Sequence, residues 1–198
     1  AASTPSTFRF AVKLPRSITH DARLRRARDP LRRFLDEAAG LGERLAVLLV
    51  QLPPSFAFEP RPVRLFFRTL REFFNGAVVC EPRHASWFVP AADRELSALR
   101  VGRAAVNPAR CPEAARPGGW MGSTGDGRGA VLYHRWHGEP RMYWSRYELQ
   151  WLGARADELA RWPVEADHWC VFDNTASGAA IVNALEFRAL IAAPRKIT

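Results

Sequence analysis

The sequence predicts an α/β fold with a parallel sheet, because short apolar segments alternate along the chain with longer amphipathic ones. Most of the apolar segments are nearly continuous, which is typical of strands that are buried on both faces. The 198 residues suffice for one ordinary domain and are few for two. An apolar fraction of 47% and a charged fraction of 25% are typical of globular proteins and exclude a disordered, collagen-like or disulfide-scaffold chain.

Six segments are expected to form strands, since each is an apolar run that stops at a polar residue or at Pro. The clearest is the run LAVLLVQL, which ends at Pro53-Pro54, where backbone amide donors are missing. The expected strands lie at residues 8–14, 45–52, 77–83, 102–107, 130–137 and 168–174.

Five helices are expected in the segments between and after these strands. The first has Pro30 in its first turn and Asp29 as its expected cap, and the second ends at the stop signal Asn75-Gly76. Residues 108–129 hold six Gly and three Pro and are expected to form a long loop, of a length that is usually functional or mobile. The expected helices lie at residues 30–41, 62–74, 92–99, 147–162 and 176–191.

The charge balance points to a polyanionic partner. Twenty-nine basic residues against 20 acidic ones give a net charge of +9, which fits nucleic acid or a phosphate-bearing ligand. The alternative is a coding bias that places Arg where other proteins have surface Lys. The densest arginine cluster, at residues 23–33, is expected to be a solvated helix face.

Cysteine usage and hydropathy bear on the compartment. Cys80, Cys111 and Cys170 are an odd set without a CxxC spacing, so we expect free thiols and a cytoplasmic location. No apolar stretch approaches the ~18–20 residues of a membrane-spanning helix, and the chain opens without the charged and apolar regions of a secretory signal. No membrane association is therefore expected.

Polar side chains gather where the expected strands end. Strand alternation places Glu81 and Arg83 on one side of their strand, and Arg135 and His137 on one side of theirs. In a barrel these ends meet at one mouth, where such barrels carry their chemistry, whereas in any sheet polar residues can simply terminate strands. The residues expected to line one common cavity are Lys13, Glu81, Arg83, Arg135, His137 and Asn174.

Glu81 and His137 are the candidate catalytic residues. Apolar neighbours are expected to raise the pKa of Glu81 and fit it for acid–base work; the alternative is an ion pair with Arg83 or Arg135 that only holds the mouth together. The histidines His20, His84 and His137 lack short ligand spacings, so we expect hydrogen-bonding roles and neither a metal nor a cofactor.

The two arginines are expected to hold an anion. Glu81 alone can neutralise only one of Arg83 and Arg135, so the remaining charge attracts an anionic group that matches the guanidinium fork. Nearby aromatic residues, among them Trp87 and Tyr143, are placed to stack on bases or sugars, whereas Trp136 alternates away from Arg135 and is expected to pack under a helix.

Two functions therefore stay open, and so does the question of whether the protein is an enzyme. The first is binding or processing of a phosphate-bearing ligand, above all nucleic acid, with Lys13, Arg83 and Arg135 as anion contacts. The second is hydrolysis of a small sugar-like substrate, with Glu81 as the acid–base group.

Over residues 8–191 the chain resembles the YecE-like family, also called domain of unknown function 72. The resemblance rests on six motifs in the family's order and implies a TIM-barrel-like fold without an agreed activity. It also adds His20, Gln51, His84, Trp87 and Tyr143 to the ligand-binding candidates. The motifs are LPRSITH with His20, VQLPPSF with Gln51, EPRH with Glu81 and His84 followed by Trp87, RWHG with Arg135 and His137, YW with Tyr143, and FDNTASGAAIVNA with Asn174.

The sequence departs from the family at several places. The glycine-rich GT-x-GW-like first strand and the VE-x-N-x-TFY-like second strand are not in it, so its six strands resemble the third to eighth of eight. We therefore expect residues 1–198 to form a single TIM-barrel-like domain that is truncated at its N-terminus relative to the family. Asn107 stands where the family often has Asp, and Asp173 stands in what is often an Asn-Asn pair.

Overall fold

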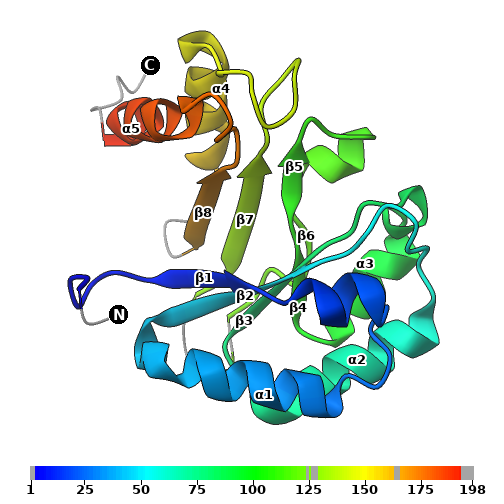
Figure 1. Cartoon of the computed structure of the whole chain (residues 1–198). Helices are drawn as coiled ribbons and strands as arrows, with labels where there is room; N and C mark the ends of the chain where they lie inside the picture. Colours follow the sequence, from blue (N-terminus) through cyan, green and yellow to red (C-terminus); the bar gives the residue numbers. More distant parts are fainter. Residues whose placement is uncertain (1–2, 124, 126–128, 163–165, 193–198) are drawn as a thin grey trace.

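The computed structural model describes residues 3–123, 125, 129–162 and 166–192, and it is an α/β fold with parallel strands, as expected (Figure 1). The strands form two sheets, and helices pack on the outer side of each. The first sheet has the order β1-β2-β3-β4-β6, and its first four strands are parallel. These strands are β1 (Phe10–Lys13), β2 (Leu45–Gln51), β3 (Ala77–Glu81), β4 (Val101–Arg103) and β6 (Gly118–Gly119).

The second sheet contains β5 (Ala105–Asn107), β7 (Val131–Trp136) and β8 (Asp167–Phe172), which are also parallel. Only Ala104 separates β4 from β5, and its amide donates to the Cys80 carbonyl at 2.9 Å. The single strand expected at residues 102–107 is therefore split, because its first half pairs with β3 and its second half with β7. This switch joins the two sheets into one succession of parallel strands in chain order.

The succession does not close into a barrel within the described residues. Among these strands β1 pairs only with β2, and β8 pairs only with β7. The part of the fold prediction that concerns the parallel α/β arrangement is confirmed, and a closed TIM-barrel-like arrangement is not. The expected long loop also contains structure: β6 pairs antiparallel with β4, and a short 3₁₀ helix spans Pro112–Ala115. Residues 124 and 126–128 of that loop lie outside the described residues.

Three helices cover the outer face of the first sheet: α1 (Arg28–Ala38), α2 (Pro60–Phe73) and α3 (Pro90–Ala98). Phe66 and Phe67 of α2 are almost wholly buried in this core, together with Leu48 of β2. The expected cap Asp29 lies inside the first turn of α1, and the N-cap is Ala27, which makes no side-chain capping bond. Short helical turns fill the connections at Ser17–Asp21, Ala39–Arg44 and Ala85–Trp87.

Two helices, α4 (Leu149–Leu159) and α5 (Ala179–Ala192), pack on the outer face of β7 and β8. Trp136 lies beneath both, as expected, with its ring centroid 5.3 Å from that of Trp151 and 4.8 Å from that of Phe187. In Figure 1 these two helices stand at the opposite side of the strands from α1 and α2.

A third apolar cluster occupies the inner face, where the two sheets meet. It contains Val47, Leu49, Val79 and Tyr133, and the half-buried Trp169 packs against it. Residues two positions further along the same strands point to the same side, because strand side chains alternate. The inner face therefore continues into the polar residues that end the strands.

No helix within the described residues is both long and apolar enough to cross a membrane. The three cysteines are free thiols, as expected, and the cytoplasmic location stays a prediction.

Trp87 should contribute strongly to stability, since it is fully buried and its indole Nε1 donates to the Phe56 carbonyl at 2.8 Å. We expect Trp87→Ala to lower the free energy of unfolding by about 3–5 kcal/mol in urea denaturation. Trp144→Ala is the matched control, because Trp144 is 46% exposed, and it should change that free energy by less than about 0.5 kcal/mol. Equal losses in both variants would contradict the burial of Trp87.

Candidate functional site

The candidate site lies on the inner face, at the carboxyl ends of the strands. Gln51 follows the inner residue Leu49 by two positions, and Glu81 follows Val79 in the same way. By the same alternation Arg135 follows Tyr133 on β7. The apolar inner cluster thus ends in a layer of polar side chains from neighbouring strands.

Glu81 is the centre of this layer. Its side chain has no solvent exposure, yet three groups donate to its carboxylate. Oε1 accepts from Gln51 Nε2 at 3.1 Å and from Arg83 Nε at 2.9 Å, while Oε2 accepts from Arg135 Nη1 at 2.6 Å. A buried carboxylate is tolerated only when charges and donors compensate it in this way.

Arg135 bridges Glu81 to a second carboxylate. Its Nη2 donates to Asp173 Oδ2 at 2.6 Å, so both terminal nitrogens contact carboxylates. The sequence predicts Arg135 as an anion contact because Glu81 alone cannot neutralise two arginines. Asp173 supplies the second negative charge, and the geometry assigns Arg135 to the internal network.

Asp173 is the site residue that sequence reasoning missed. It follows β8 directly and continues the inner side that Trp169 and Val171 occupy. Strand alternation, counted from Trp169, was the signal that could have found it. The same alternation turns Asn174 outward, where its Nδ2 donates to the Ser145 carbonyl at 2.9 Å and to Asn183 Oδ1 at 3.0 Å.

The two carboxylates are held in the ionised form. Burial raises the pKa of Glu81, but the charges of Arg135 and Arg83 and the hydrogen bonds from Arg135 and Gln51 bring it below its ordinary value. Burial also raises the pKa of Asp173, but the hydrogen bond from His137 and the charge of Arg135 together have the larger effect and bring the pKa below its ordinary value. The geometry therefore supports the ion-pair alternative for Glu81 over an acid–base group with a raised pKa.

His137 is oriented by this network. Its Nδ1 lies 2.9 Å from Asp173 Oδ2, and its Nε2 lies 4.0 Å from Glu81 Oε1. Because an ionised carboxylate only accepts hydrogen bonds, Nδ1 carries the proton that Asp173 accepts. In the neutral ring Nε2 is then the unprotonated nitrogen, and a carboxylate that orients a histidine in this way is typical of acid–base sites.

A cavity of about 110 Å³ opens beside Glu81, and Arg83 and His137 line it. Arg110 and Met142 also line it, from the segments that follow β5 and β7. On a comparable measure one water molecule needs about 10–15 Å³, so the cavity has room for a group of several heavy atoms.

Further predicted residues lie near Asp173 and Arg83. Lys13 is exposed at the end of β1, and its positive charge helps to lower the pKa of both Asp173 and His20. Burial and the charges of Arg16, Lys13 and Arg83 lower the pKa of His20, so its ring is neutral near neutral pH. Tyr143 lies near enough to Arg83 to help raise its pKa, and the Tyr143 ring centroid lies 5.4 Å from that of His137.

Two other predicted ligand contacts have structural roles. Trp87 belongs to the core under α2, so it presents no ring face to a ligand. His84 Nδ1 accepts from the Ser86 amide at 3.2 Å and thereby caps the short helix Ala85–Trp87.

Of the six residues predicted to line one cavity, Glu81, Arg83 and His137 do so. The described part of the chain contains no group of three His, Cys, Asp or Glu side chains that is arranged to hold a metal ion.

Comparisons with known proteins agree with this architecture. The sequence model for the protein of unknown function DUF72 matches residues 1–198. The UPF0759 protein YecE of Escherichia coli (strain K12) is 31% identical over 119 residues, which are 58% of this chain and 43% of that protein. The match therefore spans less than half the length of this curated relative.

Solved structures of DUF72 family proteins are similar over nearly the whole chain. The protein from Thermotoga maritima has a TM-score of 0.73 at 27% identity, and the similarity covers 96% of this chain and 76% of that one. A protein from Enterococcus faecalis has a TM-score of 0.76 at 19% identity, covering 98% of this chain and 82% of that one. The second likeness shows the fold alone.

Loss of Arg135 should destabilise the fold, because it leaves Glu81 and Asp173 without their shared partner. We expect Arg135→Ala to lower the free energy of unfolding by about 3–5 kcal/mol in urea denaturation. The exposed Arg33 is the matched control, and Arg33→Ala should cost less than about 0.5 kcal/mol. The double variant Glu81→Gln with Arg135→Ala should lose less than the sum of its single variants. If the loss in the double variant equals the sum of the two single losses, Glu81 and Arg135 are not coupled energetically.

Stability should also fall in acid. The folded-state pKa values of Glu81 and Asp173 lie below their ordinary values of 4.5 and 3.8. The two carboxylates therefore contribute fully to the free energy of unfolding when the pH is above those ordinary values. This contribution is lost as the pH falls through the lowered folded-state pKa values. Urea denaturation between pH 7 and pH 3 should show a steeper loss in the wild type than in Glu81→Gln. Parallel curves would refute ionised Glu81 as a source of stability.

Proposed function

We propose that this chain, which belongs to the DUF72 family of proteins of unknown function, binds a phosphate-bearing ligand in the cavity beside Glu81. The observation that carries the proposal is the position of Arg83. Its Nε donates to Glu81, and its side chain is 26% exposed while it lines the cavity. An arginine that a buried carboxylate holds by Nε is oriented in advance to present its terminal nitrogens to an anion.

The charges around the cavity favour an anion. Arg83 and Arg135 balance the charges of Glu81 and Asp173, so the internal network is neutral. Arg110 lines the cavity in addition, and the chain as a whole carries a net charge of +9. A cleft with cationic walls attracts and concentrates anionic ligands.

His137 supplies the proton-transfer group at this cavity. Asp173 holds its Nδ1, and the ring itself lines the cavity. Proton transfer to or from a bound phosphate ester would therefore fall to His137 Nε2. The alternative function, hydrolysis of a sugar-like substrate with Glu81 as the acid, gains no support, because such an acid needs a raised pKa and that of Glu81 is lowered.

We also propose that the parallel strands are part of a TIM-barrel-like fold. They run in chain order with helices on the outer side, and their polar carboxyl ends gather at one mouth, which is where such barrels bind ligands. A closed barrel requires further strands between β8 and β1.

Removal of a cavity arginine should weaken phosphate binding. We expect isothermal titration with inorganic phosphate to show at least about tenfold weaker binding to Arg83→Ala than to the wild type, because a hydrogen bond to a charged group is lost. Arg110→Ala should also weaken binding, and it leaves in place the three groups whose hydrogen bonds to Glu81 are described, those of Gln51, Arg83 and Arg135. The exposed Arg33→Ala is the control. Unchanged affinity in both cavity variants would refute the proposal.

A further inference from the structure

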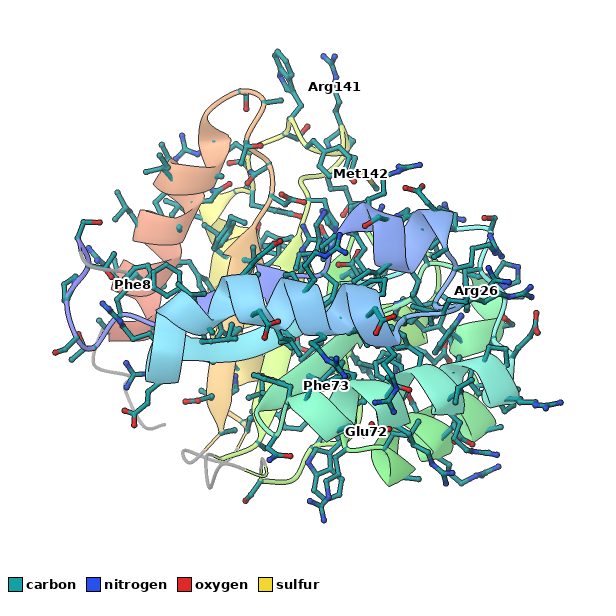
Figure 2. The ribbon with its side chains drawn as sticks, turned by 60° about the horizontal axis from the view of Figure 1, so that its bottom comes forward. Phe8, Arg26, Glu72, Phe73, Arg141 and Met142 are labelled. Atoms are coloured by element: carbon teal, nitrogen blue, oxygen red, sulfur yellow. The ribbon has the colours of Figure 1, made fainter. Side chains whose placement is uncertain are left out.

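An exposed aromatic loop stands beside the cavity. It follows β7 and includes Met142, Tyr143 and Trp144, which are 45%, 39% and 46% exposed. In Figure 2 Arg141 and Met142 lie at the top of the molecule, where the loop projects beyond the ribbon of the strands. Three large side chains left exposed in succession are uncommon for a soluble surface unless they contact a partner.

The loop is held in place by hydrogen bonds at several points. The Tyr143 amide donates to the His137 carbonyl at 2.5 Å, and Ser177 Oγ donates to the Trp144 carbonyl at 2.5 Å. Gly138 has a φ of +93°, and a Cβ there would lie 2.7 Å from the Ser145 carbonyl, so a residue without a side chain is needed. The loop backbone that carries the exposed rings is therefore fixed before any partner binds, which reduces the entropy lost on binding.

The same loop reaches the cavity. Met142 lines it, and the Tyr143 ring centroid lies 5.4 Å from that of His137, which also lines it. Trp144 lies two residues beyond Met142, a backbone span of at most about 7 Å. The Arg141 guanidinium carbon sits 4.5 Å from the centroid of the Trp144 ring.

We propose that Trp144 and Arg141 form a stacking platform for a base of single-stranded nucleic acid whose phosphate occupies the cavity. The inference rests on the proposed function, since the phosphate is the one that Arg83 holds. Fixed aromatic rings beside cations are the arrangement by which proteins bind unpaired bases without reading their sequence. A duplex would not fit this platform, because its bases are already stacked on one another.

The positive charge favours nucleic acid over a neutral sugar or an uncharged peptide. Arg83 and Arg110 line the cavity, and Arg141 lies in the loop beside Trp144. Several cations in succession match the repeated phosphates of a strand and not a ligand with one charge.

The test uses two probes, inorganic phosphate and a 5′-phosphorylated tetrathymidylate, in fluorescence or calorimetric titrations. Trp144→Ala should bind the oligonucleotide about 5- to 150-fold more weakly than the wild type, the loss expected for one stacked base. It should bind inorganic phosphate with unchanged affinity, and Trp144→Phe should recover part of the oligonucleotide affinity. Phe8→Ala is the matched control, because Phe8 is also exposed (47%) and lies away from Arg141 and Met142 in Figure 2.

The outcomes separate this inference from the function on which it rests. Equal oligonucleotide affinity in the wild type and Trp144→Ala, with phosphate still bound, overturns the stacking platform and leaves the phosphate site standing. Loss of both ligands in Arg83→Ala and loss of only the oligonucleotide affinity in Trp144→Ala support both. If the wild type binds neither ligand, both proposals fail. Equal weakening by Phe8→Ala and Trp144→Ala shows a general surface effect and also overturns the platform.

Discussion

The buried carboxylate of Glu81 is the constraint on which the rest of the site depends. An ionised group without solvent exposure is stable only if donors and opposite charges surround it. Gln51 and Arg135 meet this need from neighbouring parts of the inner face, and Arg83 meets it from two residues along the chain. The positions of these three side chains are therefore coupled, because all of them donate to the two carboxylate oxygens of Glu81.

Residues beyond the hydrogen-bond partners of Glu81 are also positioned through its partner Arg135. Arg135 reaches Asp173 with its second terminal nitrogen, and Asp173 in turn orients His137. The backbone of His137 accepts a hydrogen bond from Tyr143 and so anchors the exposed loop. A series of hydrogen bonds that begins at the buried Glu81 thus runs from the core of the sheet to the cavity and to the exposed loop beside it.

Much of the fold and part of the site could be predicted from the sequence. Apolar runs such as residues 45–52 predict buried strands, and alternation placed Glu81 and Arg83 on one side of their strand, where Arg83 Nε donates to Glu81. What alternation could not show was the partner of each polar group. Trp87 stands next to site residues in sequence, yet it packs in the core because the turn at Ala85–Trp87 directs it inward. The split of the strand at Ala104 depends on pairing with two different neighbours, which is a tertiary property.

A crystal structure of the protein grown with phosphate tests the central claim most directly, because it locates the anion and the arginines together. The account predicts a phosphate within hydrogen-bonding distance of the Arg83 guanidinium, in the cavity that His137 and Arg110 line, with Arg135 still bridging Glu81 and Asp173. A phosphate bound instead by Arg135 after it has left Glu81, or a cavity that stays free of phosphate at saturating concentration, would contradict it.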